Sequence, residues 1–167
     1  MRMRELFTSE RILPRLRARD RMTVLRQLAS AVARDASVPE DAILKHVVVA
    51  ADLPPYMPHC GVSLHHTLVS NMKHPMAALA RLDPPLEFGA PDGWPTDLAV
   101  LLASPTARPQ DHLRALAYIA RRLRRQDVRE LVRAANNRDA MYVAFTTDER
   151  SMTEDSAPRL LRAQNRI

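Results

Sequence analysis

The sequence predicts an α/β sandwich with a single β-sheet. Two amphipathic helical patterns come first, short apolar runs bounded by proline and glycine follow, and further helical patterns close the chain. The 167 residues suffice for one well-buried domain and are too few for two. Apolar residues make up 46% of the chain and aromatic residues only 4%, so the core must consist of Leu, Val, Ala and Met.

The first third of the chain predicts helices. Residues 9–12 predict a short helical turn. Residues 20–36 place apolar side chains at the i, i+3, i+4 spacing of an amphipathic helix, and Asp20 is a suitable N-cap. A second helix is expected over residues 39–46, because the β-branched run at 47–49 that follows is stiff.

The middle of the chain predicts strands. The proline-rich residues 54–58 (PPYMP) exclude a regular helix and indicate a loop. Short strands are expected at residues 61–64, 76–82 and 86–88. Residues 98–103 (LAVLLA) form the most apolar run, which is typical of a central strand buried on both faces.

The strongest helical pattern follows this last strand. Its predicted core stripe consists of Leu113, Leu116, Ala117, Ala120 and Leu123. His112 lies in the first turn, at the edge of the predicted buried face. Further helices are expected over residues 128–135 and 139–145. We expect a domain of residues 1–148 and a polar tail of residues 149–167.

Composition limits the partners and the compartment. The net charge of +6 comes mostly from arginine, and we interpret the arginine clusters as solvated faces of helices. Aromatic residues that could stack on bases are not interleaved with them, so nucleic-acid binding is not expected. The single cysteine, Cys60, excludes an internal disulfide and suggests a small buried hydrophobe. No apolar run reaches the ~20 residues that span a bilayer. The chain also starts without a signal-peptide pattern, so we expect a cytoplasmic protein off the membrane.

Histidines are the candidate functional residues. His65 and His66 end the apolar run at residues 61–66 (GVSLHH), and His112 opens a helix further on. A neutral imidazole is nucleophilic, so we read His66 and His112 as a candidate phosphoryl-accepting site. Alternatively, His66 is a chance polar residue at a strand end. Adjacent strand residues face opposite sides, so only one of the pair can point into a given site.

Metal binding is the rival interpretation of the same region. Its candidate ligands are His59, Cys60, His65 and His66. Thiolate and imidazole suit zinc or copper, but the spacing matches no closed structural site. We therefore expect no metal and no other cofactor.

Three stretches resemble a known family. Residues 61–66 (GVSLHH), 82–98 (LDPPLEFGAPDGWPTDL) and 112–123 (HLRALAYIARRL) are similar to the IIA proteins of the bacterial phosphotransferase system. The match is best to the nitrogen-regulatory branch, which is related to the fructose and mannitol IIA domains. The resemblance covers about residues 5–147 and implies a central mixed sheet flanked by helices on both faces.

The resemblance also implies a function. His66 would accept a phosphoryl group from the phosphocarrier protein HPr, and His112 would hydrogen-bond it. The chain would then be a phosphohistidine-forming phosphotransferase component that controls partner proteins. Two departures leave open a degenerate, non-phosphorylated IIA-like module. His65 replaces the family's proline, and the loop at 45–60 lacks its Ser-Thr-Gly and its arginine, with His46 nearest that position. His46 and His65 are therefore accessory candidates.

Overall fold

One mixed four-stranded sheet forms the centre of the molecule. The computed structural model describes residues 2–51, 60–90 and 92–147. The strands are β1 (Ile12–Leu16), β2 (Val62–Val69), β3 (Met76–Leu86) and β4 (Thr96–Pro105), in the spatial order β1-β3-β4-β2. The inner strands β3 and β4 are antiparallel, and each edge strand is parallel to its inner neighbour.

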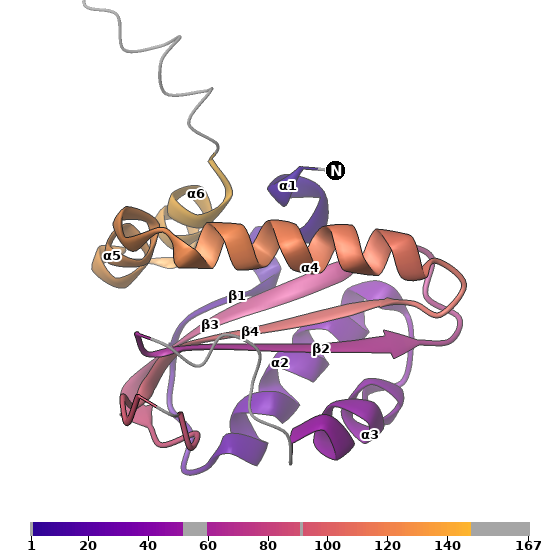
Figure 1. Ribbon diagram of the computed structural model, residues 1–167, viewed down its shortest axis with the longest axis horizontal. Helices are drawn as coiled ribbons and strands as arrows, with labels where there is room; N and C mark the ends of the chain where they lie inside the picture. The colour runs from indigo at the N-terminus through magenta and orange to yellow at the C-terminus, as the bar shows by residue number, and fades with distance from the viewer. Residues whose placement is uncertain (1, 52–59, 91, 148–167) are drawn as a thin grey trace, which may run out of the picture.

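Helices cover both faces of this sheet (Figure 1). The helices on one face are α2 (Arg21–Ala36) and α3 (Glu40–Ala51). Those on the other are α1 (Met3–Leu6), α4 (Pro109–Arg124), α5 (Gln126–Ala134) and α6 (Arg138–Thr146). The predicted α/β sandwich is confirmed. Within the described ranges, no helix has both the length and the apolar character needed to cross a bilayer.

The central strand β4 separates two hydrophobic cores. Alternate residues Ala99, Leu101 and Ala103 pack with α2 and α3. Leu98, Val100 and Leu102 pack instead with α4, α5 and α6. All six side chains are at most 1% exposed, which confirms the prediction of a strand buried on both faces.

The helical turn predicted at residues 9–12 is present as a 3₁₀ turn at Ser9–Arg11. The strand predictions were wrong at two places. The edge strand β1, which follows this turn directly, was not predicted. Pro14 fits there because an edge strand does not need its missing N–H, while its carbonyl accepts a bond from Arg81. The two strands expected between residues 76 and 88 are one strand, β3, which continues through two prolines.

The helix predictions were right in place and wrong in detail. Asp20 caps α2, accepting the backbone N–H of Thr23 at 2.7 Å. Helix α3 continues past His46 to Ala51, because Val47 packs into the core at 1% exposure and packing outweighs the weak helix propensity of valine. The predicted tail at 149–167 lies outside the described residues.

The buried face of α4 is rotated from the predicted stripe. Ala115, Ile119, Ala120 and Leu123 are buried, whereas Leu113 is 63% exposed. Both sets follow i, i+3, i+4 spacing, so the periodicity alone could not choose between them. The chosen face also buries His112.

Candidate functional site

The two predicted histidines meet on the α4 side of the sheet. His66 lies in β2, which runs parallel to β4, and is paired in register with Leu102. β4 leads directly into α4, so His112 in the first turn returns over the strand ends. Its Nε2 atom lies 3.2 Å from Nδ1 of His66, and the ring centroids are 5.1 Å apart.

A buried serine completes this arrangement. The Oγ atom of Ser104 lies 2.9 Å from Nδ1 of His112, so both nitrogens of the His112 ring are engaged. Ser104 is 0% exposed and His112 is 6% exposed. Sequence reasoning missed Ser104, although a hydroxyl that ends an otherwise apolar strand just before a helix with a histidine is a usable signal.

Both rings of the pair are neutral near neutral pH. Burial lowers the pKa of His66, and burial followed by the proximity of His66 lowers the pKa of His112. His66 itself is exposed on the surface of β2, whereas His112 lies behind it. A neutral, accessible imidazole fixed by a buried one can act as a nucleophile toward a group carried by a partner.

His65 points to the opposite face of the sheet, as strand geometry requires. Its ring is 6% exposed and packs beside Phe88, with ring centroids 6.0 Å apart. Burial, then the charge of Arg21 and the neighbouring His66, lowers its pKa to about 3. The structure therefore does not bring His65 to the His66–His112 pair.

His46 is also placed apart from this pair. It is exposed on α3, where its Nδ1 lies 3.2 Å from the carbonyl oxygen of Ala42 in its own helix. Within the described part of the chain, no hydrogen bond or ion pair joins His46 to His66 or His112. The helix continues for more than a turn beyond it.

The described residues do not assemble a metal cluster. Residues 2–51, 60–90 and 92–147 contain no group of three or more His, Cys, Asp or Glu side chains arranged to hold an ion. His65 and His66 face opposite sides of the sheet, and His59 lies outside the described residues. Cys60 is exposed, so the expectation of a small buried hydrophobe was wrong. A positive φ of 58° turns the chain sharply there.

An ion pair that the sequence pattern did not reveal fixes the start of β2. Nε and Nη2 of Arg133 donate to the two carboxylate oxygens of Asp97, each at 2.7 Å, and Nη2 also donates to the Cys60 carbonyl at 2.6 Å. The Asp97 carboxylate raises the pKa of Arg133. Gly61 lies against this pair with φ +75°, and a Cβ there would approach Asp97 Oδ1 to 2.6 Å.

Solved structures share this fold. The Nitrogen Regulatory Protein IIA-Ntr of Neisseria meningitidis has a TM-score of 0.79 at 19% identity, covering 86% of this chain and 99% of that one. The mannitol IIA of Escherichia coli has a TM-score of 0.68 at 12% identity, covering 83% and 98%. The architecture is therefore that of the IIA proteins.

Sequence comparison defines the family. The sequence model of the phosphoenolpyruvate-dependent sugar phosphotransferase system, EIIA 2, matches residues 5–147. Nitrogen regulatory proteins of Bradyrhizobium diazoefficiens and Pseudomonas aeruginosa are 34% and 33% identical over 142 and 145 residues, 85% of this chain and 93% of each relative. The chain belongs to this family, in its nitrogen-regulatory branch, and the resemblance seen in the sequence is confirmed.

Proposed function

We propose that His66 accepts a phosphoryl group from the phosphohistidine of an HPr-like carrier, and that the phosphorylated and free forms act differently on regulated proteins in the cytoplasm. One observation carries this proposal: an exposed, neutral His66 ring has its Nδ1 atom held 3.2 Å from a buried histidine. The relatives named nitrogen regulatory protein support the regulatory part.

The geometry selects the reacting nitrogen of His66. Because Nδ1 faces His112, Nε2 is the atom that would form the bond to phosphorus. As this bond forms, the bond between phosphorus and the donor ring breaks, and its electron pair leaves with the donor nitrogen. One hydrogen passes through solvent from the His66 ring to the donor ring, so both rings end neutral. Catalysis of such a transfer consists mainly of positioning and charge stabilisation.

Intact-mass spectrometry tests the proposal directly. After incubation with phosphorylated HPr, the wild-type chain should gain one phosphoryl group, and His66→Gln should gain none. His65→Gln, which changes the adjacent residue on the other face, is the matched control and should retain the gain. His46→Gln tests the accessory role that the sequence suggested.

A wild-type chain that gains no mass at any carrier level would contradict the proposal. The degenerate, non-phosphorylated module would then be the better description. A mass gain that persists in His66→Gln would place the phosphoryl group on another residue.

A further inference from the structure

The hydroxyl of Ser104 is buried next to the His112 ring. It is 0% exposed near the end of β4, and its hydrogen-bond partner among the described residues is Nδ1 of His112 at 2.9 Å. A buried hydroxyl hydrogen needs an acceptor, and an unsatisfied one is costly. The Nδ1 atom of His112 offers that acceptor if it carries no hydrogen.

The direction of this bond decides the tautomer of His112. A neutral imidazole carries one hydrogen, on Nδ1 or on Nε2. If the Ser104 hydroxyl donates to Nδ1, the hydrogen of His112 must lie on Nε2. That nitrogen faces Nδ1 of His66 at 3.2 Å and donates to it. In this arrangement the Ser104 hydroxyl hydrogen and the His112 ring hydrogen each have an acceptor.

We propose that Ser104 is a positioning residue that holds His112 as the Nε2–H tautomer and thereby keeps Nδ1 of His66 an acceptor in the phosphorylated protein. The inference rests on the proposed function above, because it concerns the lifetime of a phosphoryl group on Nε2 of His66. A phosphohistidine loses its phosphoryl group to water faster once its second ring nitrogen is protonated, since the departing ring is then neutral. Donation from His112 opposes that protonation.

The same serine also suits the attack step. During attack, Nε2 of His66 needs its lone pair, so the ring hydrogen lies on Nδ1 and points at His112. Both hydrogen bonds then reverse, and the Ser104 hydroxyl accepts where it donated before, so this arrangement costs the bond that its own hydrogen made to His112. A hydroxyl can do both, whereas an alanine or valine at this position could do neither.

Ring ¹⁵N–¹H correlation spectra of the unphosphorylated protein test the tautomer. Wild type should show His112 with its hydrogen on Nε2. Ser104→Ala should redistribute that hydrogen toward Nδ1, and Ser104→Thr should restore the wild-type pattern. Ser63→Ala is the matched control, because Ser63 is equally buried but its Oγ has no hydrogen-bond partner among the described residues. It pairs in register with Ala99, which packs on the α2 and α3 side of the sheet, away from His112.

The lifetime of the phosphorylated form is the second measurement. Ser104→Ala should shorten it about five- to tenfold at neutral pH, the value of one lost hydrogen bond, and should move the acid-accelerated limb of the hydrolysis profile to higher pH. Ser63→Ala should match wild type in both respects.

Two results would overturn the inference: a wild-type His112 with its hydrogen on Nδ1, or hydrolysis profiles that coincide for Ser104→Ala and wild type. The tautomer measurement needs no phosphoryl donor. If the chain fails to accept a phosphoryl group, the proposed function is contradicted. The tautomer of His112 can still be measured in that case, and that measurement alone decides the role of Ser104 in fixing the tautomer.

Discussion

At the scale of single residues, β2 gives two adjacent histidines opposite environments. His66 is exposed beside His112, whereas His65 is enclosed by Phe88 and Arg21 on the other face. The Nε2 atom of His65 is buried and has no hydrogen-bond partner in the part of the chain that the structure describes. The His65 ring is thus held neutral by its surroundings. Keeping it neutral should cost folding stability at acid pH, where the unfolded chain can bind a proton on this ring.

This leads to a prediction about acid stability. The folded-state pKa of His65 is about 3 and its ordinary value is 6.5. Between those values the unfolded chain binds a proton that the folded chain excludes, so folding stability falls as pH falls through the window. In His65→Leu this term is absent, and the free energy of unfolding should fall by about 2 kcal/mol less than in wild type between pH 7 and pH 5.

Urea titrations at a series of pH values measure this difference. Above about pH 7.5 the two proteins should show parallel behaviour, which serves as the internal control. Parallel loss of stability below pH 6.5 as well would show that His65 is protonated in the folded protein.

The sequence predicted part of this site and not the rest. His66 and His112 could be paired because their motifs occupy fixed places in a known family pattern, and strand alternation required His65 to face elsewhere. Ser104 was not predicted, because the sequence around a serine in an apolar strand does not show which residue it will hydrogen-bond. Arg133 escaped notice for the same reason, since its partner Asp97 is remote in sequence.

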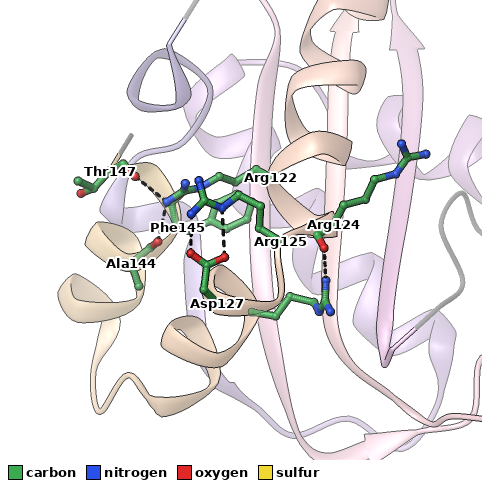
Figure 2. Close-up of polar contacts among 8 residues, drawn as sticks. Arg122, Arg124, Arg125, Asp127, Ala144, Phe145 and Thr147 are labelled. Atoms are coloured by element: carbon green, nitrogen blue, oxygen red, sulfur yellow. Dashed lines mark hydrogen bonds and ion pairs between the residues drawn. The ribbon is translucent and has the colours of Figure 1, made fainter. Parts of the chain in front are cut away.

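At the scale of elements, three arginines fill the C-terminal ends of helices. Arg129 donates to the carbonyls of Leu123 and Arg124 at the end of α4. Arg81 donates to carbonyls at the end of α5, including those of Val132 and Ala135. Figure 2 shows the third case, in which Arg122 reaches from α4 to the end of α6. Each cation satisfies carbonyls that the helix leaves unpaired and suits the helix dipole.

Loss of one such contact should loosen one helix. Arg122 is 8% exposed and donates to the carbonyls of Ala144, Phe145 and Thr147. Arg122→Met should lower the free energy of unfolding by about 1–3 kcal/mol, because buried carbonyls lose their donors. Hydrogen exchange should quicken first in α6.

Arg121→Met is the matched control, since Arg121 is exposed on the same helix. It should change stability by no more than about 0.5 kcal/mol. Equal effects of the two substitutions would show that the contacts of Arg122 contribute little.

The arginines also show why element predictions fail in detail. Interpreting them as solvated faces was right for the exposed Arg121 and Arg124 and wrong for the buried Arg122. The prediction of the buried face of α4 was wrong in a similar way, because the helix turns Leu113 outward and His112 inward. Element positions follow from periodicity, whereas the face that packs depends on neighbours from distant parts of the chain.

At the scale of the whole molecule, the pair of Arg133 and Asp97 joins three segments. It ties α5 to the start of β4, and through the Cys60 carbonyl it reaches the entry of β2. Gly61 leaves room for this junction. The strand that carries His66 is therefore fixed at its beginning as well as at its histidine.

Gly61→Ala should disrupt this junction. Its φ of +75° strains any side chain, and the new Cβ would lie 2.6 Å from Asp97 Oδ1 and 3.0 Å from Arg133 Nη2. Gly89→Ala is the matched control, because Gly89 has φ +69° and a Cβ added there would meet none of the described residues within 4 Å. The control should cost about 1 kcal/mol for backbone strain alone, and Gly61→Ala should cost at least about 1 kcal/mol more.

Thermal and urea unfolding of the two variants provide the comparison. If Gly61→Ala is no less stable than Gly89→Ala, the ion pair moves aside without cost and does not hold the strand.

The topology itself could be predicted only in class. Alternating helical and strand patterns gave an α/β sandwich with one sheet. The pairing of β1 with β3 joins residues more than sixty positions apart, as in the register of Ile12 with Leu79, and local patterns carry no such information. A proline such as Pro14 is also tolerated in a strand only at an edge position, so the local sequence does not favour a strand there.

The arginines at the helix ends have a consequence for how the protein responds to its surroundings. A guanidinium keeps its proton throughout the physiological range, so the contacts that close α4, α5 and α6 do not loosen as acidity changes. Histidines in those places would release the carbonyls as the medium became alkaline. The stability that these arginine contacts contribute should therefore not change with pH near neutrality. Because burial lowers the pKa of His66 and His112 from 6.5, their titration belongs below that value, and it should proceed while these arginine contacts stay intact.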